Sequence, residues 1–255
     1  MPVKKRRLLI FAHRGASAHA PENTIAAFEL AIKQGADLVE LDAKLSADQR
    51  VVVIHDQTVD RTTDGTGRVS TLEYDSLRIL NAGYRFRESF PGECIPRLEE
   101  VIEICVGRIK INIELTNYLS PFDQLAGEVS RIINHYHLGE QVLVSSFHPI
   151  PLRKFHDLSP EIPIALLARK GYQGWLSRGW LGRVLISYDA LHPEKSDITE
   201  ALIATARKLE YPVHTYTVND AGDMARLISL GVDGLITDDP LLASSVAKDH
   251  KFIDI

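Results

Sequence analysis

Short apolar runs alternate with longer segments of helical periodicity along nearly the whole chain. Apolar runs bounded by polar turns are typical of buried strands, and amphipathic segments such as 23–35 are typical of helices. Strands that alternate with helices pair in parallel. About eight such repeats in 255 residues predict an α/β fold of the (β/α)8 TIM-barrel type, with an open doubly wound sheet as the alternative. The strand-like runs cover 8–13, 38–45, 110–115, 142–147, 162–168, 184–190, 212–218 and 233–239.

One long polar segment interrupts the repeat after the second strand region. Residues 57–96 are rich in Thr, Gly, Asp and Arg. They far exceed the loops of about 2–6 residues that usually join strands and helices. We therefore expect a small inserted lobe at about 57–96 within a single domain that covers residues 1–255.

Two of the predicted strands alternate strictly between apolar and polar residues. Residues 39–45 read VELDAKL and residues 110–116 read KINIELT. Successive side chains of a strand point to opposite faces. In a barrel the apolar faces pack under the helices, so the polar faces, with Glu40, Asp42 and Glu114, point into the lumen or its mouth.

Three carboxylates inside a barrel require a nearby cation, because burial of an unpaired charge is costly. Barrel interiors are usually filled by branched apolar residues instead. A salt-bridge cluster with Lys44, Lys110 or Arg14 would satisfy the carboxylates. A divalent metal would also do so, and an oxygen-only set of ligands favours Mg²⁺ or Ca²⁺ over zinc. Spacing alone leaves both interpretations open.

Two of the ten histidines differ from the others in their position. His13 and His55 each end an apolar run, LLIFAH and VVVIH. The carboxyl ends of barrel strands form the face on which active sites lie. We therefore expect both imidazoles near the three carboxylates. His148 and His192 follow later strands and are weaker candidates.

Composition and charge narrow the range of partners and locations. A formal net charge of −5 gives no sign of the basic surface that binds nucleic acid. The apolar part of the N-terminal run is too short for a signal peptide, and no run approaches the length of a membrane helix, so we expect no stable membrane insertion. Cys94 and Cys105 fit no metal or redox spacing, which favours reduced thiols in the cytoplasm and leaves a disulfide between them open.

Several motifs together are similar to those of a known enzyme family. In order, the chain contains AHRG, PENT, VELDAKLSADQRVVVIHD, DRTTDGTGRV, IPRLEEVI, NIEL, VSSF, YTVN and GVDGLITDDP, between residue 8 and about residue 242. The chain thus resembles the glycerophosphodiester phosphodiesterases. That family folds as a (β/α)8 barrel with a small insertion after the second strand region, which agrees with the expected lobe.

The resemblance implies an activity and a set of site residues. The activity is metal-dependent hydrolysis of a small-molecule glycerophosphodiester, such as glycerophosphocholine or glycerophosphoethanolamine, to glycerol 3-phosphate and an alcohol. His13 and His55 would be the acid–base pair, and Mg²⁺ or Ca²⁺ would be the ion. The implied metal ligands are Glu40, Asp42 and Glu114, and the implied substrate contacts are Arg14, Glu22 and Asn23.

One position departs from the family's motif. Members commonly read NIELK or IEIK, where the lysine helps to hold the phosphate, but residue 116 is Thr here. Lys44 lies on the inward face two residues beyond Asp42 and is expected to compensate. We therefore include both Thr116 and Lys44 among the substrate contacts, and we expect Thr116→Lys to tighten binding only if Lys44 does not reach the phosphate.

Other functions and an assembly stay open. A lipid-directed enzyme, acting on lysophospholipids or phosphoinositides, would use the same groups together with an exposed apolar rim. The candidates for that rim are Trp175, Leu176, Trp180 and Leu181. A non-catalytic binding relative would be expected to have lost a histidine or a ligand. A barrel glycosidase would also use paired carboxylates but has no need of two strand-end histidines. The sequence leaves a homodimer open.

Overall fold

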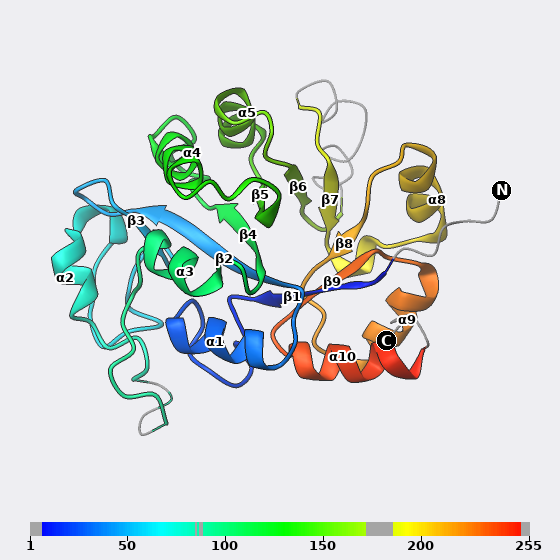
Figure 1. Ribbon diagram of the computed structural model, residues 1–255, viewed down its shortest axis with the longest axis horizontal. Helices are drawn as coiled ribbons and strands as arrows, with labels where there is room; N and C mark the ends of the chain where they lie inside the picture. The colour runs from blue at the N-terminus through cyan, green and yellow to red at the C-terminus, as the bar shows by residue number, and fades with distance from the viewer. Residues whose placement is uncertain (1–6, 85, 87–88, 172–185, 251–255) are drawn as a thin grey trace.

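The computed structural model describes residues 7–84, 86, 89–171 and 186–250 of the chain. Within them the strands form one sheet that curls into a nearly closed barrel (Figure 1). The barrel strands follow the spatial order β7-β6-β5-β4-β2-β1-β9-β8. They are β1 (Leu9–His13), β2 (Leu38–Leu45), β4 (Lys110–Leu115), β5 (Val142–Ser146), β6 (Ile164–Ala168), β7 (Ala190–Pro193), β8 (His214–Thr215) and β9 (Gly234–Thr237).

Isolated bridges join the two ends of that order. Leu191 pairs with Val213, and Glu194 pairs with Tyr216, both in parallel. In an open sheet the two outermost strands would not meet. The TIM-barrel prediction is therefore confirmed, and the open doubly wound sheet is excluded.

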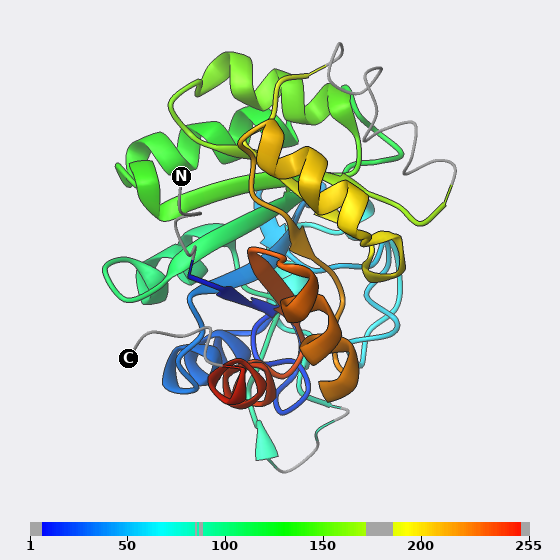
Figure 2. The same cartoon turned by 90° about the vertical axis from the view of Figure 1, so that its right-hand side faces the viewer.

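Helices surround the sheet in both views (Figures 1 and 2). The main core lies between them and the outward faces of the strands, with Phe28, Leu41 and Ile113 fully buried. No helix in the described part of the chain is long and apolar enough to cross a membrane. The helices are α1 (Ile25–Lys33), α2 (Tyr74–Arg78), α3 (Leu98–Cys105), α4 (Leu125–His135), α5 (Pro149–Leu158), α8 (Glu200–Lys208), α9 (Ala221–Leu230) and α10 (Pro240–Asp249), with 3₁₀ turns η1 (Val69–Thr71), η3 (Gly139–Gln141) and η4 (Lys195–Asp197).

The chain passes from β1 to α1 through a turn that only certain residues can form. Arg14 and Gly15 both have positive φ, 56° and 80°. A Cβ on Gly15 would lie 2.6 Å from the backbone carbon of Ala27, so glycine is required where the turn packs on α1. Thr24 caps α1 by accepting a hydrogen bond from the Ala27 amide at 3.3 Å. This turn fixes Arg14 directly after the end of β1.

The strand before His55 differs from the prediction in its direction and in its place in the sheet. β3 (Val51–Val53) is not a barrel strand, because it pairs antiparallel with the outer part of β2, Val51 opposite Leu45 and Val53 opposite Ala43. The hairpin extends beyond the barrel mouth, and β3 runs back toward it. The run VVV is therefore not a parallel strand of the barrel, but the residues that follow it bring His55 to the cavity at the barrel mouth.

Residues 57–96 lie beside β2 and β3 and carry η1 and α2 (Figure 1). A second cluster of buried apolar side chains, separate from the main core, underlies this segment. Its position agrees with an inserted lobe, while the extent of the single domain over residues 1–255 stays a prediction. The members of the cluster are Val52, Ile54, Val59, Val69, Tyr74, Leu77 and Ile95.

The strand expected at 184–190 lies later in the chain. Residues 184 and 185 are outside the described residues, and β7 begins at Ala190, which pairs with Ala165 of β6. Ile186 and Tyr188 are buried in the core without belonging to a strand. The apolar pattern there reflects burial and not sheet pairing.

Candidate active site

The carboxyl ends of β1, β2 and β4 bring the predicted residues together. His13 on β1 is opposite Glu40 on β2, and Asp42 on β2 is opposite Glu114 on β4. A cavity of about 180 Å³ opens here. It is lined by His13, Arg14, Glu40, His55, Glu114, Phe147, Tyr216, Thr217 and Ile236.

The three carboxylates form a compact buried triad. One oxygen from each of Glu40, Asp42 and Glu114 lies within 4.8 Å of the others. Burial, and then the charge of Asp42, raises the pKa of Glu40 to about 7, and the same two causes raise the pKa of Glu114. Burial acts in the same direction on Asp42, but Arg14 and His55 outweigh it and lower the pKa of that carboxyl. Burial and the mutual repulsion of the carboxylates therefore favour a bound cation at the triad.

The neighbouring cations do not neutralise this triad. The Nε of Arg14 lies 3.1 Å from Asp42 Oδ2, but Lys110 is exposed at the start of β4, and the ammonium of Lys44 bonds to Thr116. A single guanidinium cannot balance three carboxylates. The donor set, three buried oxygens close to one point, fits a hard divalent ion such as Mg²⁺ or Ca²⁺.

His13 is held by a carboxylate that the sequence did not suggest. Its Nδ1 lies 2.5 Å from Oδ1 of Asp238, which directly follows β9. Asn219 donates to the other oxygen of Asp238 at 2.5 Å. Burial alone would lower the pKa of His13, but the bond to Asp238 and the charge of Glu40 raise it. The sequence indicated this carboxylate only by its position, since Asp238 and Asp239 follow the predicted strand that ends in GLIT.

His55 is held in a similar way by its neighbour in sequence. Its Nδ1 lies 2.6 Å from Oδ1 of Asp56. Arg61 donates from Nε to Asp56 Oδ2 at 2.6 Å and from both terminal nitrogens to Glu22, at 2.6 and 2.8 Å. These bonds lower the pKa of Asp56 to about 2. Asp56 and Arg61 were also missed, although both belong to the HD and DRTT motifs.

Glu22 and Asn23 take supporting positions and do not line the cavity. Glu22 accepts from Arg14 at 2.9 Å as well as from Arg61. Asn23, which is buried and has φ 58°, donates from Nδ2 to Asp42 Oδ2 at 2.9 Å. These two residues of the PENT motif therefore orient the guanidinium and a triad carboxylate. Neither residue is among those that line the cavity, and their role as substrate contacts stays a prediction.

Lys44 and Thr116 form a pair beside the triad. The Lys44 ammonium donates to Thr116 Oγ1 at 2.8 Å, and the Thr116 hydroxyl gives its own proton to the carbonyl of Ala43 at 2.7 Å. Burial lowers the pKa of Lys44, against the nearby charges of Asp42 and Glu114. The Thr116 hydroxyl thus has no proton left to donate to a phosphate oxygen. Its oxygen instead accepts from Lys44 and holds that ammonium in place. A lysine at position 116 would bring a second ammonium against the first.

An aromatic wall borders the cavity on the side of β5 and β8. The hydroxyl of Tyr118 donates to Glu114 Oε1. Its ring meets Phe147 edge to face with centroids 5.8 Å apart, and Phe147 meets Tyr216 in the same way at 5.6 Å. Arg169 lies over the Phe147 ring at 5.3 Å. Tyr118 was not predicted, since nothing about its position in the loop after NIEL marks it.

Two weaker histidine candidates lie away from this cavity. His148 caps α5 by accepting from the amide of Ile150 at 3.2 Å. His192 is fully buried, and its Nε2 lies 3.0 Å from Nδ1 of His214. The proposed lipid-binding rim, Trp175, Leu176, Trp180 and Leu181, lies outside the described residues.

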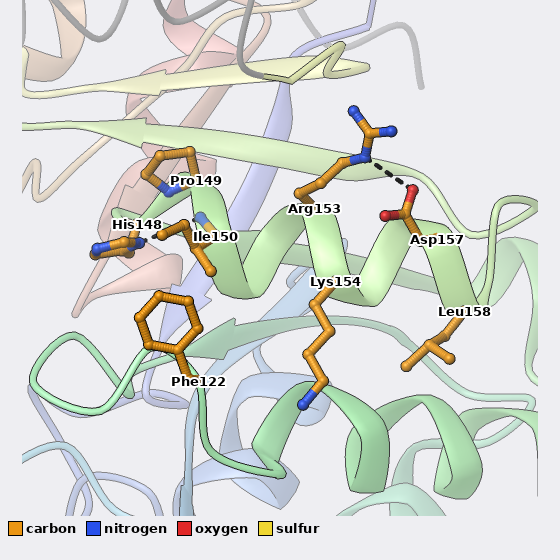
Figure 3. A pocket seen from close by; sticks show the side chains of 8 residues that line it. All are labelled: Phe122, His148, Pro149, Ile150, Arg153, Lys154, Asp157 and Leu158. Carbon is orange, nitrogen blue, oxygen red and sulfur yellow. Dashed lines mark hydrogen bonds and ion pairs between the residues drawn. The ribbon is translucent and has the colours of Figure 1, made fainter.

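A larger groove, about 670 Å³, lies along α5 (Figure 3). Its walls are mainly apolar, with Phe122 and Leu158 exposed. The charged groups are already paired, since Arg153 bonds Asp157 at 2.8 Å and Lys154 bonds the carbonyl of Asp123 at 2.8 Å. The histidine of the groove, His148, caps α5, and no cluster of carboxylates from the described residues lines the groove, so the smaller cavity at the barrel mouth is the candidate active site.

The fold and the site together define a class of protein. A parallel barrel with two carboxylate-held histidines, a guanidinium and a buried carboxylate triad at its mouth is typical of an enzyme whose site suits an anionic substrate and a hard cation. The chain belongs to the glycerophosphoryl diester phosphodiesterase family, whose model matches residues 13–242.

Individual relatives match over almost their full length. The chain is 39% identical over 235 residues to a glycerophosphodiester phosphodiesterase of Caldanaerobacter subterraneus subsp. tengcongensis, covering 92% of this chain and 95% of that one. It is 35% identical over 246 residues to one of Bacillus altitudinis, covering 95% and 99%. Among solved structures, a phosphodiesterase of Oleispira antarctica in complex with the product sn-glycerol-3-phosphate has a TM-score of 0.84 and 28% identity, covering 95% of this chain and 97% of that one.

Proposed function

We propose that the protein hydrolyses glycerophosphodiesters, such as glycerophosphocholine or glycerophosphoethanolamine, to glycerol 3-phosphate and an alcohol. One observation carries the proposal. His13 and His55, each bonded through Nδ1 to a carboxylate, line the same cavity as Glu40 and Glu114 of the triad. Two imidazoles fixed beside a cation site match a reaction that needs one proton removed and one proton supplied at a negatively charged phosphorus centre.

The contacts of the two histidines support a route for the two protons. With Nδ1–H donated to Asp238 in one case and Asp56 in the other, each ring keeps Nε2 for the reacting oxygens. One histidine accepts the proton of the nucleophile, which is water or the neighbouring hydroxyl of the glycerol. The other protonates the departing alkoxide. Each such transfer accelerates the reaction by about 10²–10⁴.

Charge neutralisation precedes the attack, because a phosphodiester repels a nucleophile. Arg14 lines the cavity, and its guanidinium is fixed by Glu22 and Asp42, so it is placed to bind a non-bridging oxygen. Lys44 adds a second positive charge at the next inward position of β2. A divalent ion held by Glu40, Asp42 and Glu114 would supply Lewis-acid stabilisation of the same oxygens.

A product assay with a chelator arm tests the proposal. Glycerophosphocholine, glycerophosphoethanolamine and a lysophospholipid are offered to the protein with Mg²⁺, with Ca²⁺ and after exhaustive chelation. We expect release of glycerol 3-phosphate from the two glycerophosphodiesters and loss of turnover after chelation. Preferential turnover of the lysophospholipid would instead support the lipid-directed alternative, and no turnover of any diester would support a non-catalytic relative.

Variants of the two histidines assign the chemistry to them. His13→Asn and His55→Asn are each expected to lower kcat by at least about 10² with the thermal midpoint unchanged. His135→Asn, an exposed histidine on α4, is the matched control and should leave kcat unaltered. Activity within a few-fold of wild type in either cavity variant would remove that residue from the mechanism.

A further inference from the structure

A second cavity, which we call the side cavity, lies next to the active site. Its volume is about 280 Å³. It is enclosed by the β2–β3 hairpin, the start of the lobe and the loop after β4, on the side of the barrel where β3 and α2 lie (Figure 1). Its walls are formed by Lys44, Leu45, Ser46, Gln49, Gln57, Val69, Ser70, Thr116, Asn117, Ser120 and Asp123.

The walls of the side cavity are rich in uncharged hydrogen-bonding groups. Hydroxyls and amides make up most of the lining, and the floor contains the buried Lys44, Thr116 and Asn117. The buried Oδ1 of Asn117 has no hydrogen-bond partner among the described residues. Gln49 and Ser70 at the rim are exposed, so the cavity is open to solvent. Such a surface suits a ligand with several hydroxyls, each of which both donates and accepts.

The charges of the side cavity disfavour a cationic ligand. The Lys44 ammonium has only Thr116 as a bonded partner in the described chain and faces the cavity at its floor. The one carboxylate of the lining, Asp123, already accepts from Asn117 Nδ2, Ser120 Oγ and the Leu125 amide. A quaternary or primary ammonium would therefore find no free carboxylate, among the described residues that line the side cavity, to balance its charge, and it would lie near the Lys44 ammonium.

Three lining residues of the side cavity each follow an active-site residue by two positions in the sequence. Lys44 follows Asp42 by two residues on β2, Thr116 follows Glu114 by two on β4, and Gln57 follows His55 by two. Two strand residues span about 6.6 Å. A phosphate placed at the triad would therefore carry its alcohol substituent within reach of Lys44 and Gln57.

We propose that the side cavity binds the alcohol moiety of the substrate and selects uncharged polyols, such as glycerol or inositol, over choline and ethanolamine. This inference rests on the proposed function, because it assumes a diester whose phosphate lies at the triad. Hydroxyls of the polyol would bond the Lys44 ammonium, the Asn117 carbonyl oxygen and the Gln57 amide. A choline ester has no hydroxyl on this side, so it would leave the buried Asn117 oxygen without a hydrogen bond, and this is the physical source of the discrimination.

The test compares kcat/KM for three diesters of glycerol 3-phosphate. They are glycerophosphoglycerol, glycerophosphocholine and the methyl ester, whose alcohol is too small to reach the side cavity. We expect the glycerol ester to exceed the choline ester by about tenfold, which corresponds to about 1.4 kcal/mol. Equal values for the two, or a preference for choline, would overturn the inference while leaving the proposed function intact. Turnover of none of the three would overturn both.

Two variants locate the selectivity in the side cavity. Ser70→Trp fills it from its exposed rim, and Gln57→Leu removes one amide from its wall. In each, we expect the ratio of glycerol ester to methyl ester to fall, by at least tenfold for Ser70→Trp and several-fold for Gln57→Leu. Thr66→Trp, an exposed lobe position that does not line the cavity, is the matched control and should leave the ratio unchanged. An unchanged ratio in both cavity variants would show that the alcohol lies elsewhere.

Discussion

Each cavity histidine depends on a carboxylate for its orientation. Asp238 lies 225 residues from His13, whereas Asp56 is the next residue after His55. A carboxylate on Nδ1 fixes the tautomer and stabilises the protonated ring. The two histidines therefore have matching local chemistry, although one pair is assembled by the barrel and the other by the chain itself.

Substitution of Asp238 should show whether this carboxylate orients His13. Asp238→Asn keeps the shape of the side chain but allows the amide to present a donor to His13, which favours the wrong tautomer. We expect kcat to fall by about 10² or more, with KM changed by less than threefold. The pKa of His13 should also drop, because the bond to Asp238 raises it, so the limb of the pH–rate profile that reports this histidine moves to lower pH.

Steady-state kinetics between pH 5 and 9 would measure both effects. Asp157→Asn, which alters an exposed carboxylate on α5, is the control. A normal kcat with an unshifted profile in Asp238→Asn would mean that His13 needs no orienting partner.

Ion binding by the triad should depend on pH in a defined direction. The pKa of Glu40 in the absence of an ion is raised to about 7, and a carboxylate must lose its proton to bind a metal. Protons therefore compete with the ion below that pH. We expect the affinity for Mg²⁺ or Ca²⁺ to weaken as the pH falls below 7, by up to about tenfold per pH unit for the proton that Glu40 must lose.

Isothermal titration of the chelated protein with each ion at pH 6 and pH 8 would check this. Glu40→Gln should abolish binding or remove its pH dependence, whereas Glu140→Gln, an exposed residue of η3, should behave as wild type. Equal affinities at the two pH values would contradict the assignment of Glu40 as a ligand.

At the scale of elements, the backbone conformation of the β1–α1 turn determines where Arg14 lies in the site. Gly15 has φ 80°, and a Cβ there would lie 2.6 Å from Ala27. Gly15→Ala is expected to destabilise the fold by about 2–3 kcal/mol, from the combined strain and clash, and to displace Arg14. Gly107→Ala is the matched control, because Gly107 has φ 71° but no atom within 4 Å of the added Cβ, so it should lose only about 1 kcal/mol.

Urea unfolding of the two variants would separate the clash from the strain. KM should rise only in Gly15→Ala, because only that turn carries Arg14, the proposed phosphate contact. Equal losses of stability in the two variants would show that the close approach to α1 contributes nothing.

At the scale of the whole molecule, a buried histidine pair links β7 to β8. His192 is fully buried, and burial, followed by the charge of His214, holds its pKa well below the usual range. Phe11 packs against both rings, with centroids 5.9 and 4.7 Å away. The folded protein therefore keeps His192 neutral at a pH at which the unfolded chain would bind a proton.

The difference in the His192 pKa between the folded and unfolded states predicts that the free energy of unfolding falls at acid pH. Below the unfolded-state pKa of about 6.5 the unfolded chain gains a proton that the folded state does not, so stability falls as pH falls, by up to about 1.4 kcal/mol per pH unit. Thermal unfolding of wild type and His192→Gln between pH 7.5 and 5 would measure it, with exposed His135→Gln as control. We expect a shallower slope only in His192→Gln, and parallel slopes in all three proteins would contradict the account.

The sequence by itself determined the barrel, the triad and the two histidines. Alternating strands and helices specify parallel pairing, and the strict alternation in VELDAKL and KINIEL specifies which side chains point inward. These patterns follow from local backbone geometry, because side chains repeat about every 2.0 residues in a strand and every 3.6 residues in a helix. They can therefore be read from the sequence without knowledge of the tertiary contacts. The HRG, E-x-D, HD and NIEL motifs then indicated Arg14, the two histidines and the three candidate metal ligands.

Only the tertiary structure decided the partners of those residues. Hydrophobic burial marks the run VVV as a strand but not its direction, so the antiparallel course of β3 could not be inferred. The Asp238–His13 bond and the bond from the Thr116 hydroxyl to the Ala43 carbonyl join residues far apart in the sequence, which meet only when β1 pairs with β9 and β2 with β4. Hydrogen bonds depend on atoms being within about 3 Å of each other, and spacing along a chain carries no such information for segments brought together by the fold.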